Sequence, residues 1–297
     1  MNDKNKVLTH ERCEGDADTS PFEHSRDDAK TREIANHYGE VARAASKTSS
    51  ACECCEPDPA HAGEAFSLYA SEAVAGLPKS ALAASRGCGD PVAKANLQPG
   101  ERVLDLGSGG GIDALIAARL VGPEGHVFGL DMTPDMVTLA RKNAAEASVE
   151  NVEFIEGSID QIPLTDASVD VVLSNCVINL CENKQAVFAE AKRVLAPGGR
   201  LVVSDIVAFS PIPQGAEESL ARITGCRRGI TPTSRYREMM AACGFSHCDI
   251  EPKTIYTIDV LREKAERKGR TEALEAAMRF DVDSVCGSAI ICGQVPE

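Results

Sequence analysis

The first residues that could do chemistry lie where an apolar run ends in a thiol. VDVVLSN (169–175) has the valine-rich composition of a buried strand, and Cys176 follows it directly. In an open parallel sheet, ligands bind outside the carboxyl ends of the strands, so Cys176 is expected to face a ligand cleft. Two further thiols, Cys88 in SRGCGDP and Cys226 in ITGCRRG, lie in loops before and after the predicted sheet and could converge on that cleft.

A glycine-rich loop, DLGSGGG, supplies a second kind of chemistry. It follows a strand-like run and opens a helical one, and Gly107, Gly109 and Gly111 allow a tight turn and close approach of a ligand to the helix amides. Asp131 ends the next predicted strand, where its carboxylate can accept hydrogen bonds from two ribose hydroxyls. This order of strand, loop, helix and acid predicts a nucleoside-containing cofactor.

The spacing of the glycines separates two candidate cofactors. A dinucleotide loop, G-x-G-x-x-G counted from Gly107, needs glycine at position 112, where the chain has Ile112. Asp105 instead gives the pattern D-x-G-x-G-x-G, which resembles the signature of class I S-adenosylmethionine-dependent methyltransferases. The loop therefore favours S-adenosylmethionine over NAD.

The cysteine-containing motifs narrow the resemblance. SRGCGDP, SNCVINL and ITGC, together with DLGSGGG, are similar to the motifs of the arsenite S-adenosylmethionine methyltransferases, over about residues 31–256. From the residues alone, the prediction stops at a methyltransferase related to soft metals. The resemblance implies that Cys88, Cys176 and Cys226 are catalytic thiolates and the ligands of trivalent arsenic, supplied as arsenite, methylarsenite or a thiol conjugate, in a reaction of arsenic detoxification.

Three thiolates suit trivalent arsenic as a methyl acceptor. The element is soft and thiophilic, prefers a pyramid of three sulfur ligands, and keeps a lone pair at the apex. That lone pair can attack the sulfonium methyl in line, so the reaction requires no general base. Catalysis is then mainly a matter of positioning.

The resemblance also implies contacts with the cofactor. Asp105 would orient the loop and the amino-acid end of S-adenosylmethionine. The further contacts would come from Met132, Ser158, Ile159 and Asn175. For Met132 and Ile159, ordinary core packing is an equal alternative.

CECC (52–55) matches a region in which the family often carries one more cysteine. By resemblance, Cys52 is assigned a catalytic role in closing a disulfide with the substrate-binding thiols or in relaying arsenic, with Cys54 and Cys55 as alternatives. Cys52 and Cys55 also have C-x-x-C spacing, but no second pair completes a zinc site. A thiol reductant, glutathione or thioredoxin, is the expected co-substrate and partner.

Two arginines next to Cys226 leave two interpretations open. Arg227 and Arg228 either lower the pKa of that thiol and favour the thiolate, or are two exposed loop charges. Before Cys88, the family often has an aromatic residue, whereas this chain has Arg86 and Gly87. The contacts of that loop are therefore not predicted.

The elements that must position these residues alternate along the chain. Helical stretches separate apolar runs at 102–107, 126–132, 152–158, 169–175 and 200–207. This alternation predicts an α/β fold with a doubly wound, Rossmann-like parallel sheet. We expect a flexible tail (1–28), an N-terminal helix and Cys-rich loop (29–71), the cofactor-binding domain (72–210) and a C-terminal α+β substrate-binding extension (211–297).

Composition limits the classes of partner and the compartment. The formal charge of −14, without a cluster of basic residues free of acids, argues against nucleic acid. No stretch has the length and apolar character of a membrane span, and no signal sequence is evident, so the expected location is the cytoplasm. There the twelve cysteines are better explained as soft-metal ligands, redox groups or buried small side chains than as a disulfide framework.

Two other functions remain open on the sequence. The cofactor site could serve a small organic acceptor, as in quinone and sterol methyltransferases. A non-catalytic protein could bind arsenite on a retained fold, although Asp105 and Asp131 argue against this alternative.

Overall fold

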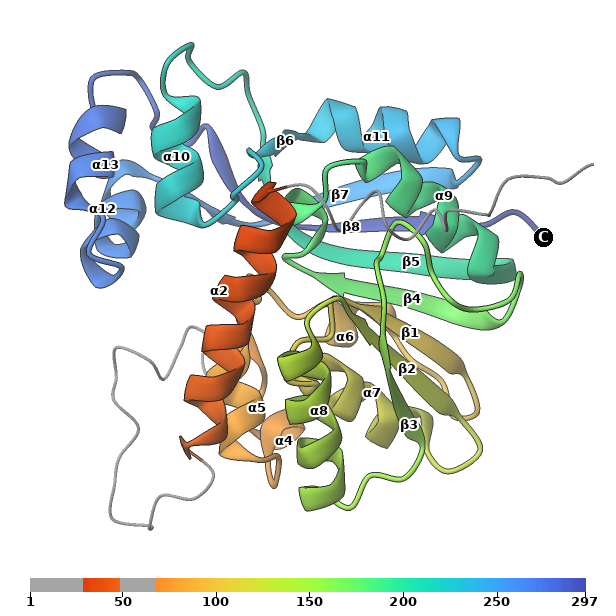
Figure 1. Ribbon diagram of the computed structural model, residues 1–297. Coiled ribbons are helices and arrows are strands. Elements are labelled where there is room, and N and C mark those ends of the chain that lie inside the picture. The colour runs from red at the N-terminus through yellow and green to blue at the C-terminus, as the bar shows by residue number, and fades with distance from the viewer. Residues whose placement is uncertain (1–28, 49–67) are drawn as a thin grey trace, which may run out of the picture.

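The computed structural model describes residues 29–48 and 68–297 (Figure 1). The predicted flexible tail (1–28) lies outside the described residues, as do Cys52, Cys54 and Cys55. The predictions made for these segments are therefore not tested.

One eight-stranded sheet organises the described chain. Its order is β3-β2-β1-β4-β5-β8-β7, with the short β6 also paired to β5. The strands are β1 (Arg102–Leu106), β2 (His126–Asp131), β3 (Val152–Glu156), β4 (Val169–Asn175), β5 (Leu195–Ala208), β6 (Thr231–Pro232), β7 (Ser246–Ile255) and β8 (Cys286–Gln294). Strands β1 to β5 are parallel, and β8 runs antiparallel to β5 and β7. The predicted doubly wound sheet is confirmed, and the C-terminal strands extend it.

Helices connect the strands and cover the sheet. They are α2 (Ala29–Ser46), α4 (Ser71–Val74), α5 (Lys79–Ala84), α6 (Pro91–Ala95), α7 (Ile112–Val121), α8 (Pro134–Glu146), α9 (Lys184–Val194), α10 (Glu217–Thr224), α11 (Thr233–Ala242), α12 (Ile258–Arg267) and α13 (Thr271–Ala277). A single 3₁₀ turn, η2 (Ile178–Leu180), follows β4.

Successive side chains of the buried strands enter opposite layers of the core. In β1, Val103 packs with α6, α7 and α8, and Leu104 packs with α9 and α11 on the other face. Such alternation is the ordinary consequence of the two-residue period of a strand. In the second layer, the Phe188 ring meets Tyr236 edge to face at 5.8 Å between centroids. The apolar runs of the sequence are thus buried on both sides.

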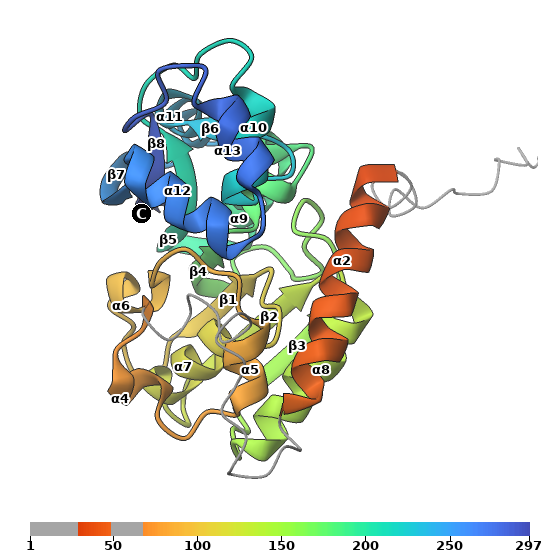
Figure 2. The ribbon, with the colours of Figure 1, turned by 90° about the vertical axis from the view of Figure 1, so that its left-hand side faces the viewer.

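Two groups of helices lie near the carboxyl ends of the parallel strands. Helices α10, α12 and α13 form a third apolar cluster with the end of β5. Helix α2, which lies in the segment predicted to hold an N-terminal helix (29–71), runs alongside α8 in both views (Figures 1 and 2) and packs on α5 and α8 through Ala42 and Ala45. Together they border the end of the sheet where a ligand is expected.

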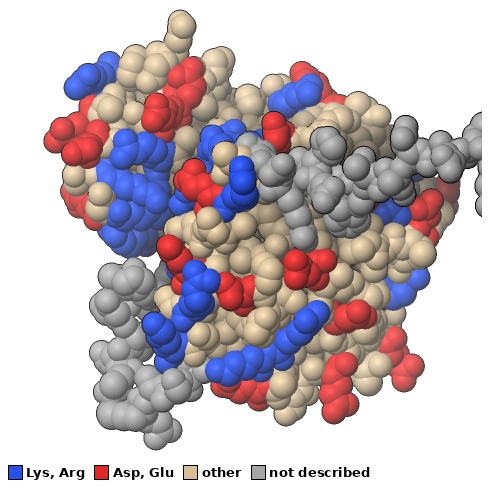
Figure 3. Space-filling view, viewed as in Figure 1, with Lys and Arg blue, Asp and Glu red and all other residues tan. Residues whose placement is uncertain are grey.

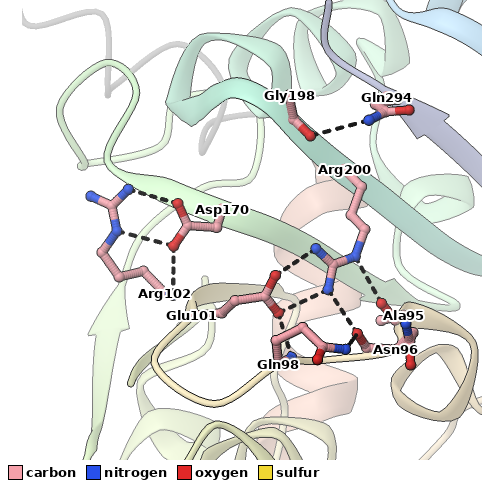
Figure 4. A network of polar contacts seen from close by, with 9 residues as sticks. All are labelled: Ala95, Asn96, Gln98, Glu101, Arg102, Asp170, Gly198, Arg200 and Gln294. Atoms are coloured by element: carbon pink, nitrogen blue, oxygen red, sulfur yellow. Dashed lines mark hydrogen bonds and ion pairs between the residues drawn. The ribbon is translucent and has the colours of Figure 1, made fainter. Parts of the chain in front are cut away.

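The opposite end of the sheet is held by ion pairs (Figure 4). At the start of β1, the Arg102 guanidinium binds the Asp170 carboxylate at 2.8 Å, which links β1 to β4. Arg200 of β5 binds Glu101 through both terminal nitrogens, at 2.7 and 2.8 Å. These contacts fix the strand ends that lie away from the predicted site.

Charges of both signs are interspersed on the face shown in Figure 3, with one basic cluster over the α10–α13 region. Among the helices of residues 29–48 and 68–297, none combines the length and apolar character needed to cross a membrane.

Truncating a buried aromatic residue should measure how far the second core layer stabilises the fold. Phe188 is fully buried, so we expect Phe188→Ala to lower the free energy of unfolding by about 3–5 kcal/mol through lost contacts and a residual cavity. Leu120→Ala, at a side chain that is half exposed, should cost less than about 0.5 kcal/mol. Denaturant unfolding of both variants checks this, and equal losses would contradict the layer assignment.

Candidate active site

A cavity of about 380 Å³ opens at the carboxyl ends of the parallel strands. Its wall is made by the glycine loop, the ends of β2 and β4, the segment after β3, and helix α2 through Ile34 and Tyr38. The lining includes seven residues predicted to bind the cofactor: Gly107, Gly109, Asp131, Met132, Ser158, Ile159 and Asn175. Their shared position matches a cleft at the point where the strand order reverses.

Two of the predicted cofactor residues, Asp105 and Gly111, lie behind this wall. Asp105 is buried under the loop, and its Oδ2 atom has no hydrogen-bond partner. Burial raises the pKa of Asp105 well above its ordinary value, and the charge of Asp113 acts in the same direction. Asp105 therefore does not line the cavity, and its burial favours the neutral, protonated carboxyl.

The glycine loop needs its glycines for two different reasons. Gly107 and Gly111 have φ angles of 71° and 90°, in the left-handed region that side chains disfavour. In addition, a Cβ at Gly107 would lie 2.6 Å from Val177, and one at Gly111 would lie 2.8 Å from the Phe154 ring. The loop can therefore fold tightly onto β3 and the segment after β4.

Asp131 joins the loop to the end of β2. Its carboxylate accepts hydrogen bonds from the backbone amides of Gly109 and Thr133, each at 2.9 Å. Burial raises the pKa of Asp131, and these two amides oppose the rise. Each carboxylate oxygen keeps a lone pair, so the side chain can still receive two ribose hydroxyls.

A second acid in the cavity, Asp113, holds a buried polar network. It accepts hydrogen bonds from the Tyr69 hydroxyl at 2.9 Å and from Asn175 Nδ2 at 3.1 Å. Burial raises the pKa of Asp113 to about 7, against the effect of these two hydrogen bonds. The cavity thus combines Asp113 and Asp131 with an apolar wall that includes Met132 and Ile159.

The loop that carries Cys88 lies directly on the ends of β4 and β5. The Cys88 amide donates to Asn175 Oδ1 at 3.0 Å, and Asn175 Nδ2 donates to the Gly89 carbonyl at 2.8 Å. A Cβ at Gly87 would lie 2.6 Å from Asn175, and one at Gly89 would lie 2.5 Å from Ser204 Oγ. The Gly-Cys-Gly sequence therefore lets this loop approach the strands.

Cys176 meets Cys88 at this junction. Its φ of 58° is left-handed, and its amide donates to the Ser204 carbonyl at 2.8 Å, so the chain turns sharply after β4. Cys88 and Cys176 are joined by a disulfide, with their Cα atoms 6.1 Å apart. Two of the three predicted arsenic ligands are thus brought together, and Cys176 lines the cavity.

Cys226 is a free, buried thiol in the same region. Cys88 and Cys176 pack against the apolar cluster that contains it, and Asn179 Nδ2 lies 3.8 Å from its sulfur. The three cysteines therefore share one side of the sheet end, with Cys226 outside the bonded pair.

The hypothesis that the neighbouring arginines lower the pKa of Cys226 is wrong. Burial raises the pKa of this thiol to about 12, and the Asp205 charge acts in the same direction. Arg227 binds Glu33 at 2.7 Å, and Arg228 binds the Thr31 hydroxyl at 2.9 Å. Both guanidinium groups contact α2, so they are neither activators of the thiol nor exposed loop charges.

Several residues at the site escaped prediction from the sequence. Asp113 follows the predicted glycine loop by two positions, and Asp205 is the one acid in the apolar run LVVSDIV. Their places in the sequence could therefore have indicated that both lie at the site. Tyr69 lies 44 residues before its partner Asp113, so its place in the chain did not indicate this. The contact of Arg86 with the cavity wall was likewise unpredicted, and its guanidinium donates to the Ala83 and Ser85 carbonyls.

Comparison with known proteins agrees with this fold. A family model described as a methyltransferase domain matches residues 97–244, which together with the sheet order defines the class I, Rossmann-like methyltransferase fold. The arsenite methyltransferase of Halobacterium salinarum is 44% identical over 200 residues, covering 67% of this chain and 51% of the relative. That of Aquipseudomonas alcaligenes is 38% identical over 222 residues, covering 72% and 61%.

A solved structure extends the similarity. The arsenic(III) S-adenosylmethionine methyltransferase of Chlamydomonas reinhardtii superposes with a TM-score of 0.56 at 30% identity, covering 82% of this chain and 75% of that one. The chain belongs to the arsenite methyltransferase family. It spans only about half to three fifths of the length of the two relatives compared by sequence.

The raised pKa of Asp113 predicts a pH effect on the stability of the ligand-free protein. Between pH 3.8 and about 7, the folded state holds a proton that the unfolded state has released, so the free energy of unfolding should fall as the pH rises through this window. Asp113→Asn should make the fall shallower. Unfolding titrations from pH 5 to pH 8 check this, and parallel curves for the two proteins would contradict it.

Proposed function

We propose that this protein transfers a methyl group from S-adenosylmethionine to trivalent arsenic held by Cys88, Cys176 and Cys226, in arsenic detoxification. The observation that carries the proposal is the junction of Cys88 and Cys176 at the wall of the cavity that the glycine loop and Asp131 also line. Arsenite, methylarsenite or a thiol conjugate of either is the expected substrate. The expected location stays the cytoplasm.

The cavity fits the cofactor in charge and shape. Asp131 would hold the ribose hydroxyls, Met132 and Ile159 would border the adenine, and Asp113 would receive the ammonium of the methionine part. When bound, S-adenosylmethionine supplies a methyl group on a positively charged sulfur. The carboxylates of Asp113 and Asp131 line the cavity, and a bound cation would favour their ionised form against the rise in pKa that burial causes.

The thiol site fits a soft acceptor better than an organic one. Methyl transfer to oxygen or nitrogen usually needs a general base, and the acid in the cavity with a pKa of about 7 is Asp113. Both oxygens of that carboxylate already accept hydrogen bonds, from Tyr69 and Asn175. A trivalent arsenic atom needs no base, because its lone pair is the nucleophile.

The reaction requires the Cys88–Cys176 disulfide to be opened. Only thiolates bind arsenic, so a thiol reductant must return both residues to the reduced form before a substrate can enter. Glutathione or thioredoxin is the proposed reductant. Cys52, outside the described residues, stays a candidate for relaying arsenic or exchanging disulfides with this pair.

Serine at each of the three thiols tests the proposal. We expect Cys88→Ser, Cys176→Ser and Cys226→Ser each to lower arsenite methylation at least 100-fold, because a hydroxyl is a poor ligand for a soft atom. The measurement is methyl transfer from labelled S-adenosylmethionine to arsenite, with excess thiol and with the products separated.

Cys243→Ser is the matched control. Cys243 is partly exposed near α11, where its sulfur contacts Gln185 at 3.0 Å, and its loss should leave the rate within twofold of that of the starting protein. Full activity of the three site variants toward an organic acceptor, with none toward arsenite in any form, would favour the organic-acceptor function. Arsenite binding without turnover would favour the non-catalytic one.

The role of Asp131 can be tested by binding alone. Asp131→Asn should weaken S-adenosylmethionine binding roughly 10–100-fold, as expected for hydrogen bonds to a charged group. Asp135→Asn, four residues after β2 ends, removes a carboxylate that pairs with Arg43 and should leave the affinity unchanged. Calorimetry measures both, and equal affinities for the two variants would refute the assignment of Asp131.

A further inference from the structure

A buried carboxylate, Asp205, lies beneath the thiol site. One of its oxygens and the sulfurs of Cys88 and Cys176 all lie within 4.8 Å of one another. Asp205 is 1% exposed, near the carboxyl end of the apolar strand β5. A charge in such a place is costly unless it is compensated, so its retention calls for a physical reason.

The partners of Asp205 are uncharged donors. Its carboxylate accepts hydrogen bonds from the Tyr236 hydroxyl at 2.8 Å, the Ile206 amide at 2.8 Å, and Asn179 through Nδ2 at 3.0 Å and its amide at 3.3 Å. Four donors commit both oxygens to accepting, which is the ionised form of the acid. The site therefore keeps a negative charge that these neighbours orient without neutralising.

The same network reaches the third thiol. Asn179 Nδ2, which binds Asp205, also lies 3.8 Å from the Cys226 sulfur. The Thr231 hydroxyl donates to Asn179 Oδ1 at 2.7 Å and so fixes the orientation of the amide. The carboxylate is thus held in a defined place relative to all three cysteines.

Methyl transfer brings positive charge to this place. The arsenic lone pair becomes the arsenic–carbon bond, the former carbon–sulfur bonding pair stays on the sulfur of the cofactor, and the positive charge passes from that sulfur to arsenic. A fixed, buried negative charge close to where positive charge develops stabilises the transition state more than the ground state.

We propose that Asp205, through the fixed negative charge of its carboxylate, stabilises the positive charge that arsenic gains during methyl transfer. This inference rests on the proposed function. Asp205 is thereby distinguished from Asp113 and Asp131, which act on the cofactor. Its effect should appear in the methyl-transfer step and not in the affinity for arsenite.

Single-turnover kinetics of three variants tests the inference. With reduced protein loaded with arsenite and S-adenosylmethionine, Asp205→Asn should slow formation of S-adenosylhomocysteine 10–100-fold, while the affinity for arsenite stays within threefold. Asp205→Glu, which keeps the charge, should recover part of the rate. Tyr236→Phe, which removes one orienting donor and keeps the carboxyl group, should slow the reaction less than Asp205→Asn does.

A binding measurement without turnover gives an independent readout. Sinefungin carries a protonated amine in place of the methyl-bearing sulfonium, and S-adenosylhomocysteine has a neutral sulfur there. Asp205→Asn should weaken sinefungin binding at least fivefold and leave S-adenosylhomocysteine binding within twofold. A role in packing alone would change both affinities or neither.

If Asp205→Asn does not fold, sinefungin binding is measured on Lys184→Gln instead. The Lys184 ammonium lies close enough for its charge to lower the pKa of Asp205, and its Nζ donates to the Cys181 carbonyl. Removing that cation should tighten sinefungin binding, whereas weaker binding would overturn the proposal.

The outcomes separate this inference from the proposed function. An active starting protein with an equally fast Asp205→Asn variant overturns the role of Asp205 alone, as does an equal slowing by Tyr236→Phe. If the starting protein forms no methylated arsenic, both the function and the inference fail.

Discussion

The site depends on one contact, the clamp between the Cys88 loop and the end of β4. Asn175 accepts a hydrogen bond from the Cys88 amide and donates one to the Gly89 carbonyl, while glycine on either side of Cys88 removes the Cβ atoms that would collide. The same Asn175 side chain binds Asp113 in the cavity. The Asn175 side chain therefore positions the Cys88 thiol and also contacts the polar network that borders the cavity. In the proposed reaction, it would link the thiol site to the cofactor site.

Buried acids set the electrostatics on both sides of this clamp. Asp113 and Asp131 line the cavity, Asp105 lies behind it, and Asp205 lies beneath the thiols. Ionised carboxylates are expensive to bury, and Asp113, Asp131 and Asp205 accept hydrogen bonds from amides or hydroxyls that hold them in place. In the proposed reaction, a cationic cofactor and the movement of positive charge would give Asp113, Asp131 and Asp205 a common physical purpose.

Much of the fold could be predicted from the sequence because local pattern and global structure agree. The apolar runs became strands in a parallel sheet, and Gly107, Gly109 and Gly111 of DLGSGGG occupy the left-handed positions of a tight loop. The meeting of Cys88 with Cys176 was predicted only as a convergence of loops. Tyr69 and Tyr236 could not be found, because their partners Asp113 and Asp205 are distant in the chain and adjacent only after folding. The prediction for Arg227 failed because neighbours in sequence were taken as neighbours in space, whereas the Arg227 side chain turns to Glu33.

The central claim is that three cysteine sulfurs surround one arsenic atom at the end of this sheet. X-ray absorption at the arsenic edge, on fully reduced protein loaded with one equivalent of arsenite, tests it most directly. The account predicts three sulfur neighbours and no oxygen, with the sulfur count reduced in Cys226→Ser. Arsenic bound through oxygen, or a sulfur count that stays the same in that variant, would contradict it.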